Sequence, residues 1–287
     1  MKRKALIVGG GPAGISAALY VLRAGFNATV IYSGSGALEK AEKIENYYGF
    51  PGGISGAELL EAGRGQAREL GAELICAEAT GLSWDGQFAL QTTEGVLRGD
   101  AVILATGTAR KRPAIENFSK FDGMGVSWCA SCDGFFCRGK QAAVLGAETY
   151  AISEAKELLP LAAKVTLLTD GADAPEVLPD GISVDTRKIT ALEGGELMEA
   201  VVFSDGEKMA ADRLFVALGT AGGAELALKA GAVMDGGAPL VDGNFQTTIP
   251  GLFAAGDCLG APFQVWSAVA QGSAAGTSAA KFLRDMK

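Results

Sequence analysis

Two cysteines, Cys129 and Cys132, are three residues apart in the segment WCASCDGFFCRG, near the middle of the 287-residue chain. A Cys-x-x-Cys pair can bind a metal, stay inert, or alternate between a dithiol and a disulfide. A zinc site needs four ligands, yet the chain contains no histidine and its other cysteines are Cys76, Cys137 and Cys258. The spacing C-x2-C-x4-C is an incomplete set for zinc or for an iron–sulfur cluster. The sequence therefore favours a redox-active pair over the inert alternative and predicts no metal site.

The absence of histidine also restricts the acid and base chemistry. Catalytic triads and metal sites that depend on histidine are excluded, so protons must be carried by carboxylates, thiols, lysines, tyrosines or water. A Cys-x-x-Cys at a helix start has a depressed thiol pKa, because the N-terminal backbone N–H groups stabilise a thiolate. In the same region we expect Phe135 and Phe136 to pack rather than react, and Cys137, like Cys76, to be a buried thiol.

The composition is that of an ordinary globular protein, with 48% hydrophobic and 20% charged residues and a net charge of −8. This charge gives no basic surface for nucleic acid, since the clusters at residues 2–4 and 110–112 are short. GGGPAG interrupts the first apolar stretch, and no later run of eighteen apolar residues is unbroken, so no membrane partner is expected. The odd number of cysteines does not suit a secreted disulfide framework. We therefore expect a cytoplasmic protein.

A dinucleotide-binding pattern opens the chain. The apolar segment KALIV leads into a turn with glycines at Gly9, Gly11 and Gly14, then into the helical pattern ISAALYVLRAG and a second apolar strand. Strand, G-x-G-x-x-G, helix and strand together form the βαβ unit in which a pyrophosphate rests on the helix N-terminus. This context makes the glycine pattern more specific than a structural turn alone.

The same pattern occurs a second time from Lys140 onward. At a constant offset of 137 residues, the aligned pairs are Gly9 with Gly146, Gly14 with Ala151 and Ser33 with Asp170. Farther on, GDAVILATGTA (99–109) aligns with ADRLFVALGTA (211–221) at an offset of 112. The repeat predicts an α/β protein with two Rossmann-like three-layer domains.

The last part of the chain contains a strand that ends at Gly256-Asp257, followed by a long helix of small residues. Asp257 at the carboxyl end of a strand could accept hydrogen bonds from cofactor hydroxyls, while the helix N-terminus faces an electron-rich group. The alternative is an ordinary C-terminal strand and helix.

Five motifs, in this order, resemble the low-molecular-weight, bacterial-type thioredoxin reductases. They are GGGPAG, ENYYGFPG at 45–52, ATGT at 105–108, CASCDGFF at 129–136 and TTIPGLFAAGDC at 247–258. The resemblance implies a homodimeric flavoprotein that reduces thioredoxin. It also implies an FAD domain formed by residues 1–112 and 240–287, with a Cys-x-x-Cys domain, residues 113–239, inserted between them.

The resemblance also implies roles for individual residues. Cys132 would face the flavin, Cys129 would attack the substrate disulfide, and Asp133 would protonate the departing thiolate, although Asp133 could also cap the helix. Ser33 stands where family members often carry an acid for the adenosine ribose. The residues expected at FAD are Gly9, Gly11, Pro12, Ala13, Gly14, Ser33, Asn46, Thr106, Gly107, Gly256, Asp257, Gln264 and Val265.

The second repeat departs from the family at its nicotinamide site. Glu148 stands where the second glycine should let a pyrophosphate approach, and the usual arginine cluster is replaced by TDGADAPE at 169–176, with Asp170 and Asp173. An acid at Asp170 suits the ribose of NAD but repels the 2′-phosphate of NADP. The sequence therefore argues against NADPH, and Glu148 hinders NADH, unless an unaligned basic residue compensates.

In this loss the chain resembles the ferredoxin-dependent flavin thioredoxin reductases, which makes ferredoxin the expected electron donor. The basic clusters at 2–4 and 110–112 are candidates for binding an acidic ferredoxin. The alternatives are a conventional NADPH-dependent reductase, a diflavin disulfide reductase, and a dithiol oxidase that passes electrons to oxygen, which the lack of histidine disfavours. A non-enzymatic flavin-binding module would leave the CASCD segment without a role.

Overall fold

The structure is a computed structural model that describes residues 2–34, 36–107, 112–219 and 222–286. The chain forms two compact α/β units: unit 1 comprises Met1–Ala109 and Gly222–Lys287, and unit 2 comprises Arg110–Ala221. The second boundary corrects the expected one, which assigned residues up to 239 to the middle domain. The physical reason is packing, because helix α6 (Gly223–Lys229) is largely buried against strands β4 and β7 of unit 1.

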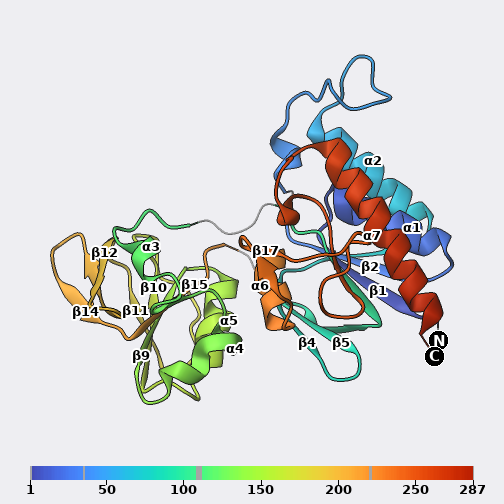
Figure 1. The fold of residues 1–287 in the computed structure, drawn as a ribbon. Coiled ribbons are helices and arrows are strands. Elements are labelled where there is room, and N and C mark those ends of the chain that lie inside the picture. Colours follow the sequence, from blue (N-terminus) through green and yellow to red (C-terminus); the bar gives the residue numbers. More distant parts are fainter. Residues whose placement is uncertain (1, 35, 108–111, 220–221, 287) are drawn as a thin grey trace. The chain divides into compact units, whose positions relative to one another are not determined.

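A five-stranded parallel sheet forms the middle layer of unit 1. Its order is β18 (Leu252–Ala254), β7 (Ala101–Leu104), β1 (Lys4–Val8), β2 (Asn27–Tyr32) and β3 (Glu73–Cys76). The central strands are continuous apolar runs because both faces of the sheet are covered. One face carries α1 (Pro12–Arg23), α2 (Gly56–Glu69) and α7 (Val265–Asp285), as Figure 1 shows.

An antiparallel sheet covers the other face of unit 1. It consists of β4 (Ala79–Trp84), β5 (Phe88–Thr92) and β6 (Gly95–Gly99), and Gly99 lies directly against Leu6 of β1. The remaining short elements are η1 (Leu38–Lys40), β16 (Met234–Asp235), β17 (Ala238–Pro239) and η3 (Asp257–Leu259). Unit 1 therefore has the three layers that the repeat predicted.

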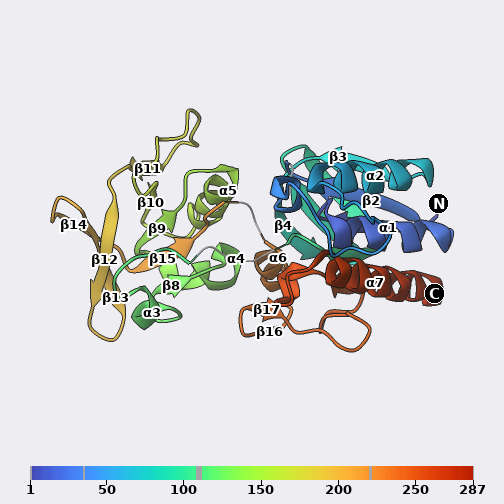
Figure 2. The same ribbon diagram turned by 90° about the horizontal axis from the view of Figure 1, so that it is seen from above.

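Unit 2 has the same plan on a smaller scale. Its parallel sheet has the order β11 (Ile182–Asp185), β10 (Lys164–Leu168), β9 (Gln141–Leu145), β15 (Arg213–Val216) and β8 (Val126–Ser127). Helix α5 (Thr149–Leu158) covers one face, and a three-stranded sheet of β12 (Ile189–Gly194), β13 (Met198–Phe203) and β14 (Lys208–Ala210) packs on the other (Figure 2). Three short helices complete the unit: α3 (Phe118–Phe121), α4 (Ala130–Asp133) and η2 (Gly134–Cys137).

One backbone contact confirms the repeat in three dimensions. Gly9 has φ +124°, and a Cβ on it would lie 2.0 Å from the carbonyl oxygen of Ala105. Gly146 has φ +151°, and its Cβ would lie 2.3 Å from the carbonyl oxygen of Ala217. Gly9 aligns with Gly146 and Ala105 with Ala217 in the two separate sequence alignments. Both units therefore bring the loop after the first strand onto the same neighbouring strand end.

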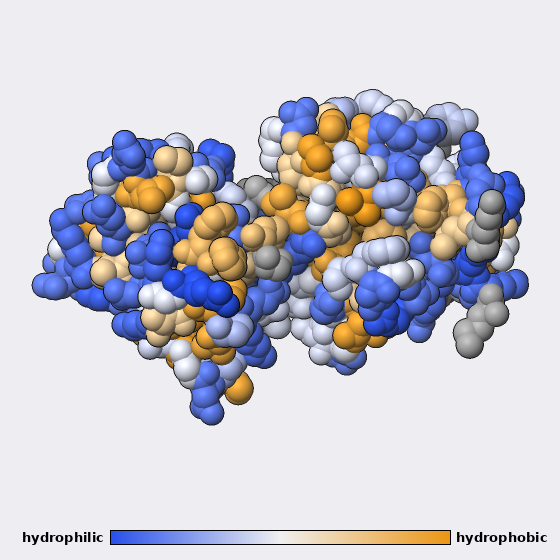
Figure 3. Space-filling model, turned by 60° about the horizontal axis from the view of Figure 1, so that its bottom comes forward, coloured by the Kyte–Doolittle hydropathy of each residue, from blue (hydrophilic) through white to orange (hydrophobic). Residues whose placement is uncertain are grey.

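Some large apolar side chains lie at the surface of each unit, among them Trp266 of unit 1 and Val177 of unit 2. On the face shown in Figure 3, hydrophobic and hydrophilic residues are interspersed. Within the described ranges, no helix, the 21-residue α7 included, combines the length and apolar character needed to cross a membrane.

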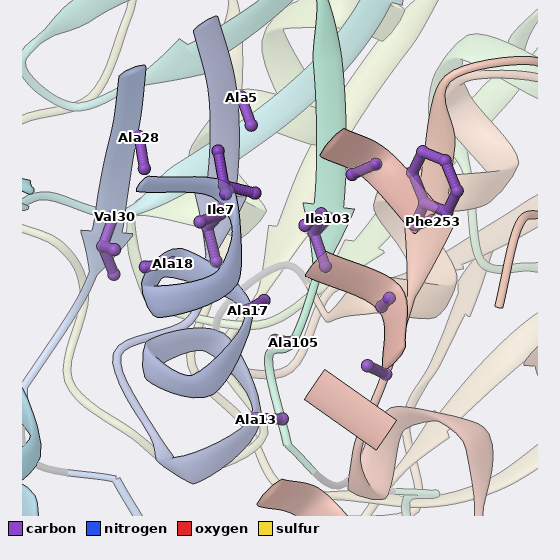
Figure 4. Close-up of a cluster of buried hydrophobic side chains, with 14 of the residues drawn as sticks. Ala5, Ile7, Ala13, Ala17, Ala18, Ala28, Val30, Ile103, Ala105 and Phe253 are labelled. Carbon is purple, nitrogen blue, oxygen red and sulfur yellow. The ribbon is translucent and has the colours of Figure 1, made fainter. Parts of the chain in front are cut away.

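Small residues let α1 and α7 pack closely over the sheet. The core beneath them contains Ala5, Ile7, Ile103 and Phe253, with alanines of α1 directed into it (Figure 4). On α7, a Cβ at Gly272 would lie 2.0 Å from the carbonyl oxygen of Ala13, so the two backbones touch. Close-packed interiors cannot absorb even one added methyl group without a shift.

We therefore expect Gly272→Ala to destabilise the protein by about 1–3 kcal/mol, because its methyl group must push α1 and α7 apart. Gly65→Ala is the matched control, since Gly65 lies inside α2 with nothing within 4 Å of its Cβ direction. That substitution should stabilise by about 0.5–1 kcal/mol through backbone entropy. Urea unfolding midpoints measure both, and equal midpoints for the two variants would contradict the close-packing argument.

Candidate functional site

The two cysteines of the CASC segment form a disulfide, with their Cα atoms 5.3 Å apart. As expected, a helix begins here: Cys129 is the N-cap of α4, and its Sγ accepts a hydrogen bond from the backbone N–H of Cys132 at 3.1 Å. Cys129 is 1% exposed, whereas Cys132 is exposed. Of the residues described, no group of three His, Cys, Asp or Glu is arranged to hold a metal ion. The pair is thus positioned for disulfide chemistry at the start of a helix.

Two side chains that the sequence interpretation missed support this segment. The Ser127 hydroxyl accepts the backbone N–H of Cys129 at 3.2 Å and donates to Oδ2 of Asp133 at 2.6 Å. Oε2 of Glu154, on α5, accepts the backbone N–H of Ala130 at 2.7 Å. The suggested capping role of Asp133 is wrong, because sulfur of Cys129 provides the cap of α4 and the Asp133 carboxylate bonds to Ser127 instead.

Phe135 and Phe136 differ from expectation, because they are 65% and 55% exposed rather than packed. The Arg138 guanidinium lies 5.6 Å from the ring centre of Phe135, and that of Arg213 lies 5.1 Å from the ring centre of Phe136. They follow the dithiol directly in the chain. Unit 2 therefore presents two aromatic rings that follow Cys132 in the chain, each with an arginine side chain near it.

The remaining cysteines divide into two groups. Burial raises the pKa of Cys137 to about 11 and that of Cys258 to about 12, so both thiols stay protonated at neutral pH. Cys76 is exposed, which corrects the expectation that it is buried. The reason is its position on β3, which is the edge strand of the unit 1 sheet.

In unit 1, the glycine loop between β1 and α1 has open space beside Gly11. Gly9 and Gly14 serve the packing of the loop itself, since a Cβ on Gly14 would lie 1.8 Å from the carbonyl oxygen of Gly9. Gly11, the N-cap of α1, has nothing within 4 Å of its Cβ direction, and Pro12 and Ala13 begin the helix behind it. A phosphate can approach the α1 N-terminus at Gly11, which fits the pyrophosphate of FAD.

Other expected FAD residues gather at the carboxyl edge of the same sheet. Strands β7 and β18 are parallel neighbours, so Thr106 and Gly107 after β7 lie beside Gly256 and Asp257 after β18. A Cβ on Gly256 would lie 2.8 Å from that of Ala13, which ties this edge to the glycine loop. Burial raises the pKa of the half-buried Asp257 carboxyl. The edge therefore carries hydrogen-bonding groups suited to a ribityl chain.

Two residues far apart in sequence meet at the start of α7. Nδ2 of Asn46 donates a hydrogen bond to Oε1 of Gln264 at 3.1 Å, and Gln264 is the N-cap of the helix that Val265 begins. Gly11, Pro12 and Val265 also line a cavity of about 420 Å³ formed with α2 and residues 47–50, whereas the other expected FAD residues are not among its lining.

Ser33, the residue expected near the adenosine ribose, follows a tyrosine that contacts a basic side chain. Ser33 is exposed after the end of β2, and the adjacent Tyr32 ring has the Arg64 guanidinium 4.5 Å from its centre. Nε of Arg64 also donates to the carbonyl oxygen of Gly10 at 3.4 Å. Arg64 lies on α2 outside every motif of the sequence, so no sequence pattern predicted its contact with the loop.

The corresponding edge of unit 2 is different. Exposed Glu148 is the N-cap residue of α5 without forming a side-chain cap. Oδ1 of Asp170 accepts the backbone N–H of Ile189 at 2.8 Å, and its Oδ2 pairs with Nζ of Lys188 at 2.7 Å. Both carboxylate oxygens of Asp170 are therefore engaged, and the positive charge of Lys188 is neutralised.

Arg187, the other cation at this edge, is held still more firmly. Its guanidinium bonds to both oxygens of Asp185, approaches Asp205 at 3.1 Å and lies 3.9 Å from the ring centre of Phe203. The hydrogen bonds to Asp185 raise the pKa of Arg187, and the same bonds lower that of Asp185. Both Arg187 and Lys188 are therefore paired with aspartates at this edge.

The cations expected to bind ferredoxin are only partly available for it. Arg110 and Lys111 lie outside the described residues, and Arg112 pairs with Asp122 at 2.8 Å. Lys4 pairs with Glu73 at 3.6 Å.

Comparisons with known proteins agree on one family. The family Pyridine nucleotide-disulphide oxidoreductase matches residues 3–272. A thioredoxin reductase of Aquifex aeolicus is 33% identical over 302 residues, covering 98% of this chain and 94% of the relative. One from Streptomyces clavuligerus is 31% identical over 303 residues, again covering 98% and 94%.

Solved structures are similar over the same length. The atypical thioredoxin reductase TRi from Desulfovibrio vulgaris Hildenborough has a TM-score of 0.93 and 39% identity, covering 99% of this chain and 98% of that one. A ferredoxin-flavin thioredoxin reductase from Clostridium acetobutylicum has a TM-score of 0.74 and 29% identity, with the same coverage.

The burial of Asp257 leads to a pH-dependent prediction. In the folded protein the pKa of Asp257 is raised above the unfolded value of about 3.9. Its contribution to folding stability is therefore fully present below the unfolded pKa and is lost as pH rises through the folded pKa. Asp257→Asn should therefore raise the urea midpoint of flavin-free protein at pH 7, and the gain should vanish below about pH 4. The same variant should bind FAD more weakly.

Asp242→Asn is the control of opposite sign. Backbone N–H groups of Gln246 and Asn244 lower the pKa of Asp242, so its charge stabilises the fold above about pH 4 and the asparagine variant should be less stable at pH 7. A lower midpoint for both variants at pH 7 would refute the desolvation cost at Asp257.

Proposed function

Since the chain belongs to the pyridine nucleotide-disulphide oxidoreductase family, and within it to the low-molecular-weight thioredoxin reductases, we propose that its electron donor is ferredoxin and its substrate thioredoxin. It is a thioredoxin-reductase-type flavin disulfide reductase with FAD as cofactor and a Cys129–Cys132 disulfide. A homodimer in the cytoplasm is the expected form of the enzyme.

The single observation that carries the choice of donor is the pairing of both cations at the nucleotide edge of unit 2. Arg187 is bound by Asp185 and Asp205, and Lys188 by Asp170. A 2′-phosphate would have to break one of these pairs to gain a positive partner. NADPH would lose the charge recognition that distinguishes it from NADH.

Glu148 adds a second obstacle that applies to either nicotinamide cofactor. It lies at the start of α5, where a pyrophosphate would approach the helix N-terminus. Two like charges about 4 Å apart repel by ~1 kcal/mol in water and ~4 kcal/mol at an effective dielectric constant near 20. That range corresponds to a loss of roughly tenfold to a thousandfold in affinity. A protein donor that delivers electrons to the flavin avoids this site altogether.

The cofactor has a suitable site in unit 1. Gly9, Gly11 and Gly14 would leave the α1 N-terminus open to its pyrophosphate, while Asp257 would accept hydrogen bonds from its hydroxyls. FAD, when bound, supplies the electron pair that reduces the disulfide. The similarity to a reductase named for ferredoxin and flavin supports the single-electron donor.

The disulfide exchange uses the Cys129–Cys132 pair and the neighbouring Asp133. Two electrons and one proton convert the Cys129–Cys132 bond to a thiolate and a thiol. The thiolate attacks a substrate disulfide, so one sulfur–sulfur bond forms and one breaks, and Asp133 protonates the departing sulfur. The second cysteine returns its thiol proton to Asp133 as it attacks the mixed disulfide, which releases the substrate as a thiol and a thiolate and restores the Cys129–Cys132 bond. Attack by Cys129, which is buried in the disulfide, requires its sulfur to become accessible after reduction.

The exposed rings support a protein substrate. Aromatic residues and arginine are enriched in the energetically dominant parts of protein interfaces. Phe135 and Phe136, each with an arginine near its ring, provide such a surface next to the dithiol in sequence. A small disulfide does not need contacts of this extent.

The donor is tested by the visible absorbance of the flavin under anaerobic conditions. We expect reduced ferredoxin to reduce the flavin on the timescale of enzyme turnover. NADPH and NADH at millimolar concentration should leave the flavin oxidised. Bleaching by NADPH alone would refute the ferredoxin proposal and leave the disulfide reductase class intact. Oxygen uptake with a small dithiol would instead indicate the oxidase alternative.

The substrate surface is tested by Phe135→Ala combined with Phe136→Ala. The variant should raise KM for thioredoxin by about tenfold or more, since loss of an aromatic contact at an interface commonly costs above 1 kcal/mol. Its rate with a small aromatic disulfide should remain unchanged. Val177→Ala, which removes another exposed apolar side chain of unit 2, is the control and should alter neither rate. Equal loss with both substrates would show that the rings act on the dithiol rather than on docking.

A further inference from the structure

We propose that Glu154 is a positioning residue that makes the Cys129–Cys132 dithiol a stronger reductant, through its hydrogen bond to the backbone of Ala130 and its buried negative charge. This inference rests on the proposed disulfide chemistry and assigns a role to a side chain outside the Cys-x-x-Cys segment.

The position of Glu154 in α5 sets it apart from the other acids of unit 2. It is 1% exposed and shares a buried helix face with Tyr150, Ala151, Ala155 and Leu158. Glutamate is rarely buried so completely, because transfer of a carboxylate from water is costly unless a partner compensates. An acid retained among apolar residues therefore indicates a specific contact.

That contact is inside the redox motif. Oε2 of Glu154 accepts the backbone N–H of Ala130 at 2.7 Å, and Ala130 is the first residue of α4, directly after Cys129. Helices α4 and α5 pack against each other, which holds the carboxylate at this end of α4. The hydrogen bond joins the buried face of α5 to the peptide group between the two cysteines.

Backbone N–H groups at a helix start normally stabilise a cysteine thiolate. In this segment the N–H of Cys132 is directed to Sγ of Cys129, while the N–H of Ala130 is taken by the carboxylate. A negative charge next to the sulfur pair also opposes the formation of a second one. Both effects raise the thiol pKa and so favour the disulfide over the reduced form.

Two further acids have described contacts next to the cysteines: Asp133 through Ser127, and Asp122 through the indole N–H of Trp128. Asp212, Lys140 and Arg213 act on the neighbouring Cys137 thiol. These groups stay in place when Glu154 is replaced, so the replacement isolates one charge. Reduction of the disulfide by a thiol reagent consumes two electrons and one proton and yields a thiolate and a thiol. A more stable thiolate therefore shifts that equilibrium toward the reduced protein.

The test uses the flavin-loaded protein and Glu154→Gln, which keeps the shape of the side chain and removes its charge. The protein is equilibrated with glutathione redox buffers, and the Cys129–Cys132 state is read by alkylation and mass spectrometry. We expect reduction to become about tenfold more favourable, which is a potential about 30 mV higher. The rise of the alkylation rate with pH in the reduced protein should also begin at a lower pH than in the wild type.

Three further variants make the outcome decisive. Glu154→Asp retains the charge and should stay nearer to wild type than the glutamine variant. Glu148→Gln removes an exposed charge from the start of the same helix and should change neither readout. If the glutamine variant does not fold, Glu154→Met, an apolar side chain of similar volume, should shift the equilibrium in the same direction.

A potential and an alkylation profile within twofold of wild type for Glu154→Gln, or for Glu154→Met in its place, would overturn the proposal and leave Glu154 a packing residue. Because the measurement uses glutathione alone, it does not depend on the identity of the electron donor. Failure of the ferredoxin or thioredoxin proposals would therefore be seen in other assays.

Discussion

The carbonyl oxygen of Ala105 occupies the space that a side chain at position 9 would need, and the rest of unit 1 depends on this contact. Because the loop after β1 lies on the backbone that follows β7, α1 starts directly over the carboxyl edge of the sheet. The same closeness continues along α1, where Gly272 of α7 meets the backbone of Ala13. Two stretches separated by most of the chain are thereby joined into one compact unit.

The repeat of this contact in unit 2 shows that both units share one architecture. Gly146 meets Ala217 as Gly9 meets Ala105, so the fold of a nucleotide-binding unit is retained. The residues at the edge differ, because Glu148 stands at the start of α5 and Arg187 and Lys188 pair with aspartates. A fold can be kept while the residues at its edge change, since the sheet and the edge residues are independent requirements. In unit 2 the retained fold carries the disulfide.

A buried or half-buried carboxyl group is the common feature of the two chemically important regions. Asp257 is held half-buried at the cofactor edge, and Glu154 is fully buried under the dithiol. Burial raises the pKa of Asp257, and Glu154 bonds to the backbone N–H of Ala130, directly after Cys129. Sites that carry chemistry commonly retain such locally unfavourable groups.

The sequence by itself determined the two-unit α/β fold and the redox pair. Those features depend on local spacing: apolar runs of strand length, glycines at fixed intervals, and two cysteines one helical turn apart. The resemblance to the family also predicted that Glu148 and Asp170 stand where a nicotinamide site has other residues.

Tertiary structure alone decided which groups meet and which are exposed. Cys76 is exposed because β3 is an edge strand, and the boundary near residue 221 follows from where α6 packs. The pairing of Lys188 with Asp170 and of Glu154 with Ala130 joins residues 18 and 24 positions apart. Periodicity predicts which face of an element is buried, but the neighbour that covers that face comes from another part of the chain, and only the folded chain specifies it.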